Sequence, residues 1–243
     1  MAAGSVEGGA GPFAGQLALV TGASRGIGAA TAEALAAGGA HVVLTGRDTA
    51  RLEGVEDAIF NAGGSATIAP VDLTEPEGIA RLIAALGQRW QALDVLVLAA
   101  AAFPALTPVT QIESRELNRT LTLNLMAQQA LLAHCDPMLK RSPDARVIAL
   151  TSSVGQRPRA YWGAYGASKA ALEALLTAYA EETRATSRIR VAIVDPGATR
   201  TAMRARAYPG EDPASVKPPE VVATRIVELA ANPFASGHRE RVE

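Results

Sequence analysis

The sequence contains few cysteines and histidines, the residues typical of disulfide-bonded and metal-binding proteins. It has a single cysteine, Cys135, so no disulfide can form within the chain, which fits a reducing compartment. We interpret Cys135 as a small apolar residue in a helix. The three histidines, His41, His134 and His238, are scattered without the spacing of metal ligands. We therefore expect no metal site.

The chain also lacks a large net charge and long apolar segments. The formal net charge is −1, which argues against attraction of the whole protein to nucleic acid or to an anionic membrane. The longest apolar run covers only residues 95–103, whereas a membrane-spanning helix needs about 20 residues. Residues 1–15 lack the basic and apolar regions of a secretory signal and predict a flexible leader. We expect a soluble, cytoplasmic protein with no nucleic-acid or membrane partner.

The chain does contain enough apolar residues, 49% of 243, for a large core. Six short segments are apolar throughout, as expected of strands buried on both faces of a parallel sheet. Their alternation with helical stretches predicts right-handed crossovers and a single-domain, doubly wound α/β fold over residues 16–243. The expected strands are 17–20, 41–46, 66–72, 94–99, 146–152 and 189–195, and the expected helices are 27–38, 49–62, 76–92, 114–140 and 161–184.

A glycine-rich turn, TGASRGIG, lies between the first expected strand and the first expected helix. Glycines at this place let the backbone approach a pyrophosphate, and the helix N-terminus offers N–H groups and a positive dipole to it. An ordinary turn would rarely need three glycines here, so we predict a dinucleotide site. The predicted contacts are Gly22, Ser24, Arg25, Gly26, Ile27 and Gly28.

This turn resembles the cofactor loop of the short-chain dehydrogenase/reductase (SDR) family, and the resemblance extends over residues 16 to 228. It implies a Rossmann-like sheet and a nicotinamide cofactor. Segments 156–162 and 200–213 resemble a bacterial YciK-like branch. One departure follows the fourth strand, where SDR enzymes usually carry Asn-Ala-Gly and this chain has Leu98, Ala99, Ala100 and Ala101. We expect the missing asparagine to loosen this strand, while cofactor binding survives through backbone contacts.

The end of the second expected strand predicts which cofactor binds. A carboxylate there would bind the 2′-hydroxyl of NAD, but this strand ends Thr45-Gly46-Arg47. Arg47, with Arg25 as a second cation, favours the 2′-phosphate of NADP(H) over NAD(H). Asp48 weakens the case slightly, unless it caps the next helix. The resemblance also implies adenine contacts at Asp72 and Leu73, although Asp72 fits a turn residue nearly as well.

The segment AYWGAYGASKAA contains two tyrosines and one lysine. Tyr165 and Lys169 stand at i and i+4, so they share one face of a helix. A nearby ammonium lowers the pKa of a phenol, and a tuned tyrosine can exchange a proton with a carbonyl oxygen. Tyr161 has no cation at its +4 position, so we assign the chemistry to Tyr165 and place Tyr161 at the helix start or pocket wall.

The resemblance implies the remaining site residues. SDR enzymes place a serine 13 residues before the tyrosine, which is Ser152 here, to hold the substrate oxygen. Its neighbour Ser153 should point the other way if the strand pattern persists. Asn124 matches the asparagine that supports a water leading to the lysine, although spacing alone does not separate it from Asn118. The Pro-Gly segment DPGATRT implies cofactor contacts at Pro196, Gly197, Thr199 and Thr201.

These residues predict an NADP(H)-dependent oxidoreductase that interconverts a small-molecule carbonyl and an alcohol. One alternative is a 3-oxoacyl carrier-protein-type reductase, supported only by the arginines of segments 156–162 and 200–213. Another is a catalytically idle nucleotide-binding regulator, which would have no need of Ser152, Tyr165 and Lys169 together. The Ala- and Leu-rich helices 114–140 and 161–184 predict a homodimer. The charged tail ASGHRERVE predicts a last strand that is short or absent.

Overall fold

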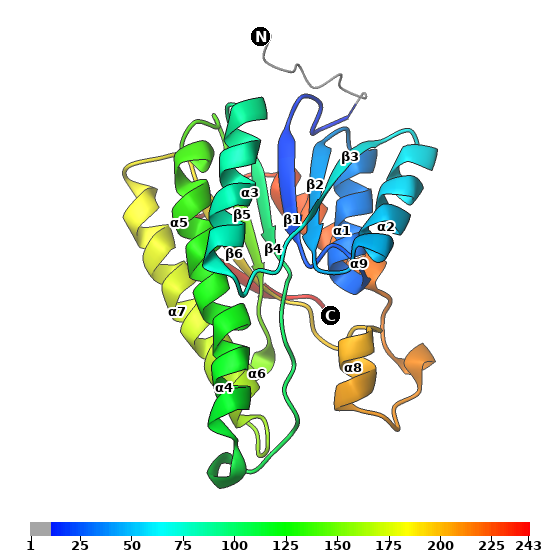
Figure 1. Ribbon diagram of the computed structural model, residues 1–243, viewed down its shortest axis with the longest axis vertical. Helices are drawn as coiled ribbons and strands as arrows, with labels where there is room; N and C mark the ends of the chain where they lie inside the picture. Colours follow the sequence, from blue (N-terminus) through cyan, green and yellow to red (C-terminus); the bar gives the residue numbers. More distant parts are fainter. Residues whose placement is uncertain (1–10) are drawn as a thin grey trace.

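The computed structural model describes residues 11–243. Seven strands in this part of the chain form one parallel sheet in the order β3-β2-β1-β4-β5-β6-β7, with helices on both faces (Figure 1). The strand order reverses between β1 and β4, which is where doubly wound sheets bind ligands. The predicted fold class is confirmed.

All six predicted strands and four of the five predicted helices agree with the structure to within three residues at each end. The strands are β1 (Leu17–Thr21), β2 (His41–Gly46), β3 (Ser65–Pro70), β4 (Val95–Leu98), β5 (Arg146–Leu150), β6 (Arg190–Asp195) and β7 (His238–Arg241). The longer helices are α1 (Gly26–Ala37), α2 (Thr49–Asn61), α3 (Pro76–Arg89), α4 (Ser114–Leu121), α5 (Ala127–Leu139), α7 (Gly163–Arg184) and α9 (Pro219–Ala231). The short ones are η1 (Val109–Gln111), α6 (Ser153–Gln156), α8 (Ala202–Ala207) and η3 (Pro213–Ser215).

The sheet separates two buried apolar clusters. Helices α3, α5 and α7 pack on one face, and α1, α2 and α9 pack on the other (Figure 1). In β6, Val191 and Ile193 belong to the first cluster, and Ala192 and Val194 belong to the second. Because successive residues of a strand point to opposite faces, a strand with both faces covered needs apolar residues throughout. This explains the continuous apolar runs in the sequence.

The expected leader lies mostly outside the described residues, but its end does not. Phe13 is 1% exposed within the second cluster, and its N–H donates to the Gly38 carbonyl oxygen at 2.9 Å. A Cβ on Gly38 would come within 2.6 Å of Phe13 Cδ2, so glycine makes room for the ring. Residues 11–15 therefore belong to the folded domain, which corrects the predicted boundary at residue 16.

Two further features differ from the sequence-based expectations, and a third agrees with them. The expected helix 114–140 is divided by a π-helical turn, η2 (Thr122–Met126). The expected helix 161–184 begins only at Gly163, because Tyr161 has φ +71°, which a right-handed helix excludes. The last strand, β7, expected to be short or absent, is short and pairs with β6 over four residues.

Two general properties of residues 11–243 bear on function. None of the helices there is long and apolar enough to cross a membrane. No group of three or more histidine, cysteine, aspartate or glutamate residues in the same range could hold a metal ion. Cys135 is fully buried in α5, and burial raises its thiol pKa to about 12, so it behaves as an apolar side chain.

Candidate active site

The glycine turn between β1 and α1 is built so that only glycine fits. Gly22 and Gly26 have φ of 67° and 58°, in the left-handed region. A Cβ on Gly28 would lie 2.3 Å from the Gly22 carbonyl oxygen. No side chain of the described residues caps the N-terminus of α1, so its first N–H groups remain open. The shape of this turn and the open N–H groups suit the pyrophosphate of a dinucleotide.

The end of β2 lies next to this turn. A Cβ on Gly46 would be 3.7 Å from Ser24 Oγ, which places the loop serine beside the strand end. The Arg47 side chain is 62% exposed and its guanidinium lies 3.9 Å from Asp72 Oδ2. Asp48 accepts a hydrogen bond from the Arg51 N–H at 3.2 Å and caps α2, so its carboxylate is engaged there. Arg47 is thus a cation available to a 2′-phosphate.

Asp72 has the contacts of a turn residue. Its Oδ1 accepts hydrogen bonds from the N–H and hydroxyl of Thr74, at 2.9 and 2.7 Å. Burial alone would raise its pKa, but the Thr74 bonds and the cations Arg47 and Arg119 hold that pKa below the usual range. Asp72 is therefore ionised near neutral pH. The adjacent Leu73 is 5% exposed and belongs to the core.

The segment after β4 lacks the family's usual asparagine but is firmly attached. The Thr21 hydroxyl accepts hydrogen bonds from the N–H groups of Ala99 and Ala100, at 3.0 and 3.1 Å, and donates to the Val97 carbonyl oxygen. Gln128, on α5, donates to the Ala100 carbonyl oxygen at 3.2 Å. The expectation of a loosened strand is therefore wrong, because two buried side chains provide the attachment.

The predicted tyrosine and lysine are both buried on α7. Tyr165 packs against Phe103, with ring centres 5.2 Å apart, and its hydroxyl lies 3.7 Å from Met203 Sδ. Lys169 Nζ lies 5.8 Å from the centre of the Tyr165 ring and donates to the Leu150 carbonyl oxygen at 2.8 Å. Tyr161, by contrast, is 58% exposed and lies outside the helix.

Burial dominates the electrostatics of this pair. It raises the pKa of the Tyr165 phenol above its ordinary value, and the Asp195 carboxylate adds to the effect. Burial also lowers the pKa of the Lys169 ammonium to about 8, although Glu173 acts in the opposite direction. The direction for Tyr165 is opposite to the one expected from the lysine alone. The phenol is protonated at neutral pH, the state needed to donate a proton to a carbonyl oxygen.

Ser152 precedes α6, which packs directly on α7. A Cβ on Gly166 would lie 2.9 Å from the Val154 carbonyl oxygen, so glycine permits this close contact. Ser152 and Ser153 both line a cavity of about 310 Å³. The reason for preferring Ser152 by strand alternation does not hold, because β5 ends at Leu150 and α6 begins at Ser153. The resemblance remains the ground for choosing Ser152.

Asn124 is fully buried in the π-helical turn. Its amide side chain makes two hydrogen bonds with the backbone of Ala102, at 2.7 and 2.9 Å, and donates to Ser168 Oγ at 3.0 Å. Ser168 donates in turn to the Tyr165 carbonyl oxygen at 2.7 Å. Asn124 thus holds the helix that carries Tyr165, whereas Asn118 is exposed on α4.

The Pro-Gly segment after β6 returns to the glycine turn. Gly197 has φ 63°, and a Cβ there would lie 2.5 Å from the Val242 carbonyl oxygen. Thr199 donates to the Pro196 carbonyl oxygen at 2.9 Å. Thr201 accepts a bond from the Arg204 N–H and caps α8, and its methyl group would be 3.4 Å from a Cβ on Gly26. The predicted contacts 196–201 and 22–28 therefore meet.

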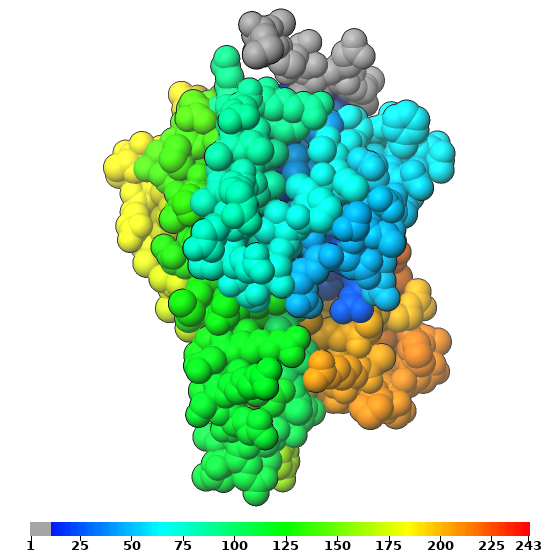
Figure 2. All heavy atoms as spheres, in the orientation of Figure 1, coloured from blue at the N-terminus to red at the C-terminus, as the bar shows by residue number. Residues whose placement is uncertain are grey.

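Aromatic side chains surround Tyr165. Trp162 lies 5.3 Å from Phe103 and 5.8 Å from Tyr208, between ring centres. Tyr208 follows α8, whose orange atoms lie directly beside the green atoms near α4 in the space-filling view (Figure 2). Phe103 was missed, since one phenylalanine at the end of an apolar run carries no signal of a site.

Comparisons with known proteins agree with this geometry. The family model described as short chain dehydrogenase matches residues 16–212. The oxidoreductase YciK of Escherichia coli K12 is 34% identical over 207 residues, which cover 84% of this chain and 81% of YciK.

Solved structures extend the comparison to the whole fold. A short chain dehydrogenase from Pseudomonas syringae superposes with a TM-score of 0.92 at 37% identity, covering 99% of this chain and 100% of that one. A short chain dehydrogenase from Shigella flexneri, complexed with NADP, superposes with a TM-score of 0.90 at 31% identity, covering 95% of this chain and 98% of that one. The chain therefore belongs to the short-chain dehydrogenase family of oxidoreductases.

Proposed function

We propose that this protein interconverts a carbonyl and an alcohol with NADP(H), and that Tyr165 exchanges the proton. The observation that carries the proposal is the buried Tyr165 with Lys169 Nζ 5.8 Å from the centre of its ring. When bound, the nicotinamide cofactor supplies or accepts the hydride. Tyr165 donates its proton to the carbonyl oxygen, and Ser152 holds that oxygen by a hydrogen bond. Asn124 keeps the helix of Tyr165 in place through Ser168.

The cofactor would be held by the turn after β1, the end of β2 and the Pro-Gly segment. Arg47, with no carboxylate at Gly46, supports the phosphorylated cofactor, since a carboxylate there would repel a 2′-phosphate. The Shigella flexneri relative complexed with NADP, and an Escherichia coli CFT073 relative complexed with NADPH, support the same choice.

The substrate would have an apolar body that packs on Phe103, Trp162 and Tyr208. A 3-oxoacyl carrier substrate remains the second candidate, because Arg159 lies at this rim and donates to the Tyr208 hydroxyl at 3.3 Å. Arg204 does not support it, since its guanidinium is paired with Glu211.

A panel of ketones, aldehydes and alcohols, run with both cofactors and followed at the nicotinamide absorbance band, tests the proposal. We expect turnover of apolar carbonyl compounds with NADPH. Binding of NADPH without turnover of any compound would instead support the idle regulator.

We also propose a cytoplasmic homodimer built on α5 and α7. Leu175 on α7 and Met126 at the start of α5 are partly or largely exposed, at 36% and 61%, and a second copy would cover them. β7, with only four residues, makes a weak edge for a further interface. Light scattering at micromolar protein should give a dimer mass, and a stable monomer or tetramer would contradict this.

A further inference from the structure

A buried carboxylate lies one helical turn beyond Lys169. Glu173 is 4% exposed on α7 and shares a helix face with Lys169, four residues earlier. It accepts hydrogen bonds from the Thr151 hydroxyl, from Gln156 Nε2 at 3.1 Å and from Arg239 Nη1. A buried charge costs free energy unless it is paired, and these three donors offset that cost for the carboxylate.

Glu173 and Lys169 hold consecutive residues of the same segment. Lys169 donates to the Leu150 carbonyl oxygen, and Glu173 accepts from Thr151. The next residue is Ser152, the proposed partner of the substrate oxygen. Gln156 ends α6, so the carboxylate binds this segment on both sides of Ser152.

The backbone is shaped to admit this carboxylate. A Cβ on Gly155 would lie 3.1 Å from Glu173 Oε1 and 3.2 Å from the Lys169 carbonyl carbon. Both contacts are tighter than an ordinary van der Waals contact, so the glycine lets α6 lie directly on this part of α7. The position of Ser152 relative to α7 is thus defined by the carboxylate and this glycine together.

The counterion comes from the last strand. Arg239, on β7, pairs with Glu173, and its Nη2 donates to Thr177 Oγ1 at 2.7 Å. β7 is itself held in register by β6, where Arg239 stands beside Ile193. The carboxylate therefore connects three segments: the end of β5 with α6, the helix of Tyr165, and the C-terminal strand.

From this geometry we infer that Glu173, with Arg239 as its counterion, is a positioning residue for the reaction at Tyr165. It holds the Ser152 segment on α7 and sets the local charge beside Lys169. The inference rests on the proposed function. The titratable groups around Lys169 are Tyr165 and Glu173 on its own helix, Arg239 on β7 through Glu173, and Asp195 at the end of β6, which acts on Tyr165.

Two substitutions test the charge, because they should move the pH profile in opposite directions. In Glu173→Gln, Lys169 loses a neighbouring negative charge and its ammonium deprotonates at lower pH, so the alkaline limb of kcat should move down. In Arg239→Gln, the carboxylate loses its counterion, so the alkaline limb should move up. If Glu173 had only a structural role, the two substitutions would lower stability but would not shift the alkaline limb of kcat in opposite directions.

A third substitution tests the hydrogen bond alone. Thr151→Val removes the donor at nearly constant volume and keeps both charges. We expect kcat for carbonyl reduction to fall about tenfold in Glu173→Gln and less in Thr151→Val, because Ser152 is displaced. The Kd for NADPH should change less than about twofold, which corresponds to less than 0.5 kcal/mol. The matched control is Glu181→Gln, an exposed carboxylate on the same helix that pairs with Arg184.

The outcomes separate the two proposals. A wild-type protein that turns over no carbonyl compound defeats the proposed function. A wild-type protein that does, with both charge variants keeping its alkaline limb, overturns the positioning inference alone. If Glu173→Gln does not fold, Arg239→Gln decides, since its side chain is 38% exposed at the sheet edge. If the alkaline limb of kcat does not move in Arg239→Gln, the inference is rejected. A shift of that limb to higher pH would support it.

Discussion

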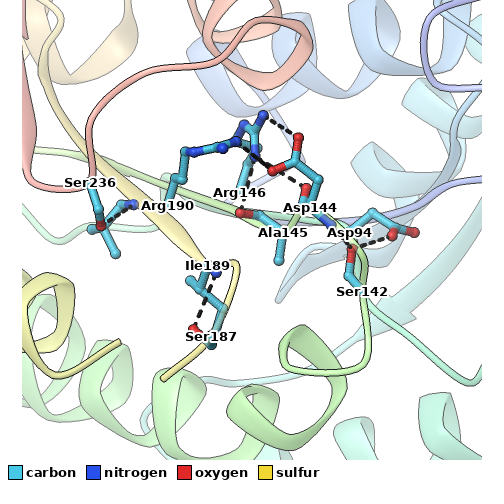
Figure 3. Close-up of polar contacts among 10 residues, drawn as sticks. Asp94, Ser142, Asp144, Ala145, Arg146, Ser187, Ile189, Arg190 and Ser236 are labelled. Atoms are coloured by element: carbon cyan, nitrogen blue, oxygen red, sulfur yellow. Dashed lines mark hydrogen bonds and ion pairs between the residues drawn. The ribbon is translucent and has the colours of Figure 1, made fainter. Parts of the chain in front are cut away.

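The two ends of the sheet use polar side chains for different purposes. At the amino ends of β4, β5 and β6, side chains pair with one another and with the backbone (Figure 3). Asp94 accepts from the Leu17 N–H and from the Ser142 hydroxyl, at 2.9 and 2.7 Å. Arg146 and Arg190 both pair with Asp144. These contacts join the starts of neighbouring strands.

At the carboxyl ends of the strands, by contrast, a hydroxyl, several N–H groups and a guanidinium are not fully engaged by the described residues. Among the described residues, the hydrogen-bond partner of the Tyr165 hydroxyl is a thioether at 3.7 Å, which is a weak acceptor. The N–H groups at the start of α1 have no side-chain cap among the described residues, and Arg47 is largely exposed. One end therefore holds the strands together, and the other keeps donors and charges available for a ligand. Substitutions at the two ends should separate stability from turnover.

The largest effect should come from Tyr165→Phe, which removes only the hydroxyl. We expect kcat for carbonyl reduction to fall about 10³-fold, because the proton donor is lost. NADPH binding, measured by fluorescence titration, should stay unchanged. Tyr161→Phe is the matched control and should retain turnover, since its ring is exposed. A dead Tyr161→Phe with an active Tyr165→Phe would reverse the assignment.

At the amino ends of the strands, we expect a substitution to lower stability without lowering turnover. In Asp144→Ala, the Arg146 side chain, which is 4% exposed, loses its carboxylate partner. Removing one partner of a buried pair is costly, and because Asp144 itself is 51% exposed we expect about 2 kcal/mol off the free energy of unfolding. Urea unfolding measures it, with Glu181→Ala as the exposed control. A fall in kcat without a loss of stability in Asp144→Ala would contradict the difference between the two ends of the sheet.

A smaller effect is expected at the end of β2. Arg47→Ala should weaken NADP⁺ binding about tenfold, because a charge-assisted hydrogen bond to the 2′-phosphate is lost. NAD⁺ binding should not change, since NAD⁺ has no such phosphate. Arg51→Ala, which removes a nearby arginine paired with Asp48, is the control. Equal affinities of the wild type for the two cofactors would contradict this source of selectivity.

The smallest effect is a dependence on pH. Burial lowers the pKa of Lys169 to about 8, so the ammonium is present below that pH and lost above it. Tyr165 stays protonated there, because burial raises its pKa. We expect kcat for carbonyl reduction to be constant below pH 8 and to fall above it as the charge beside the phenol disappears. A profile that rises through pH 8 would show that the neutral lysine is the active form.

The sequence predicted local features of the site better than distant ones. Gly22, Gly26 and Gly28, and the pair Tyr165–Lys169, were predictable because their spacing along one turn or helix determines their geometry. The Glu173–Arg239 pair was not, because 66 residues separate its members and only the sheet brings them together. The same limitation explains the wrong expectation for the segment after β4.

Other misses have local causes. Helices α8 and α9 were not predicted, since the first has only six residues and the second begins at Pro219, the second of two consecutive prolines that suggest a loop. The direction of the Tyr165 pKa was also missed, because a sequence shows which cation is near but not how completely the ring is buried.

The π-helical turn that carries Asn124 has a consequence for the helices on either side of it. A π turn contains one more residue than an α turn, so α5 is rotated by one residue, about 100°, from where a continuous helix through α4 would place it. Deleting one residue of Thr122–Met126 would restore an unbroken α-helix. Such a deletion would force either Asn124 away from Ala102 and Ser168 or Leu131 out of the core. The single additional residue therefore allows Asn124 and Leu131 to keep both of their positions, which an unbroken helix over the same segment could not do.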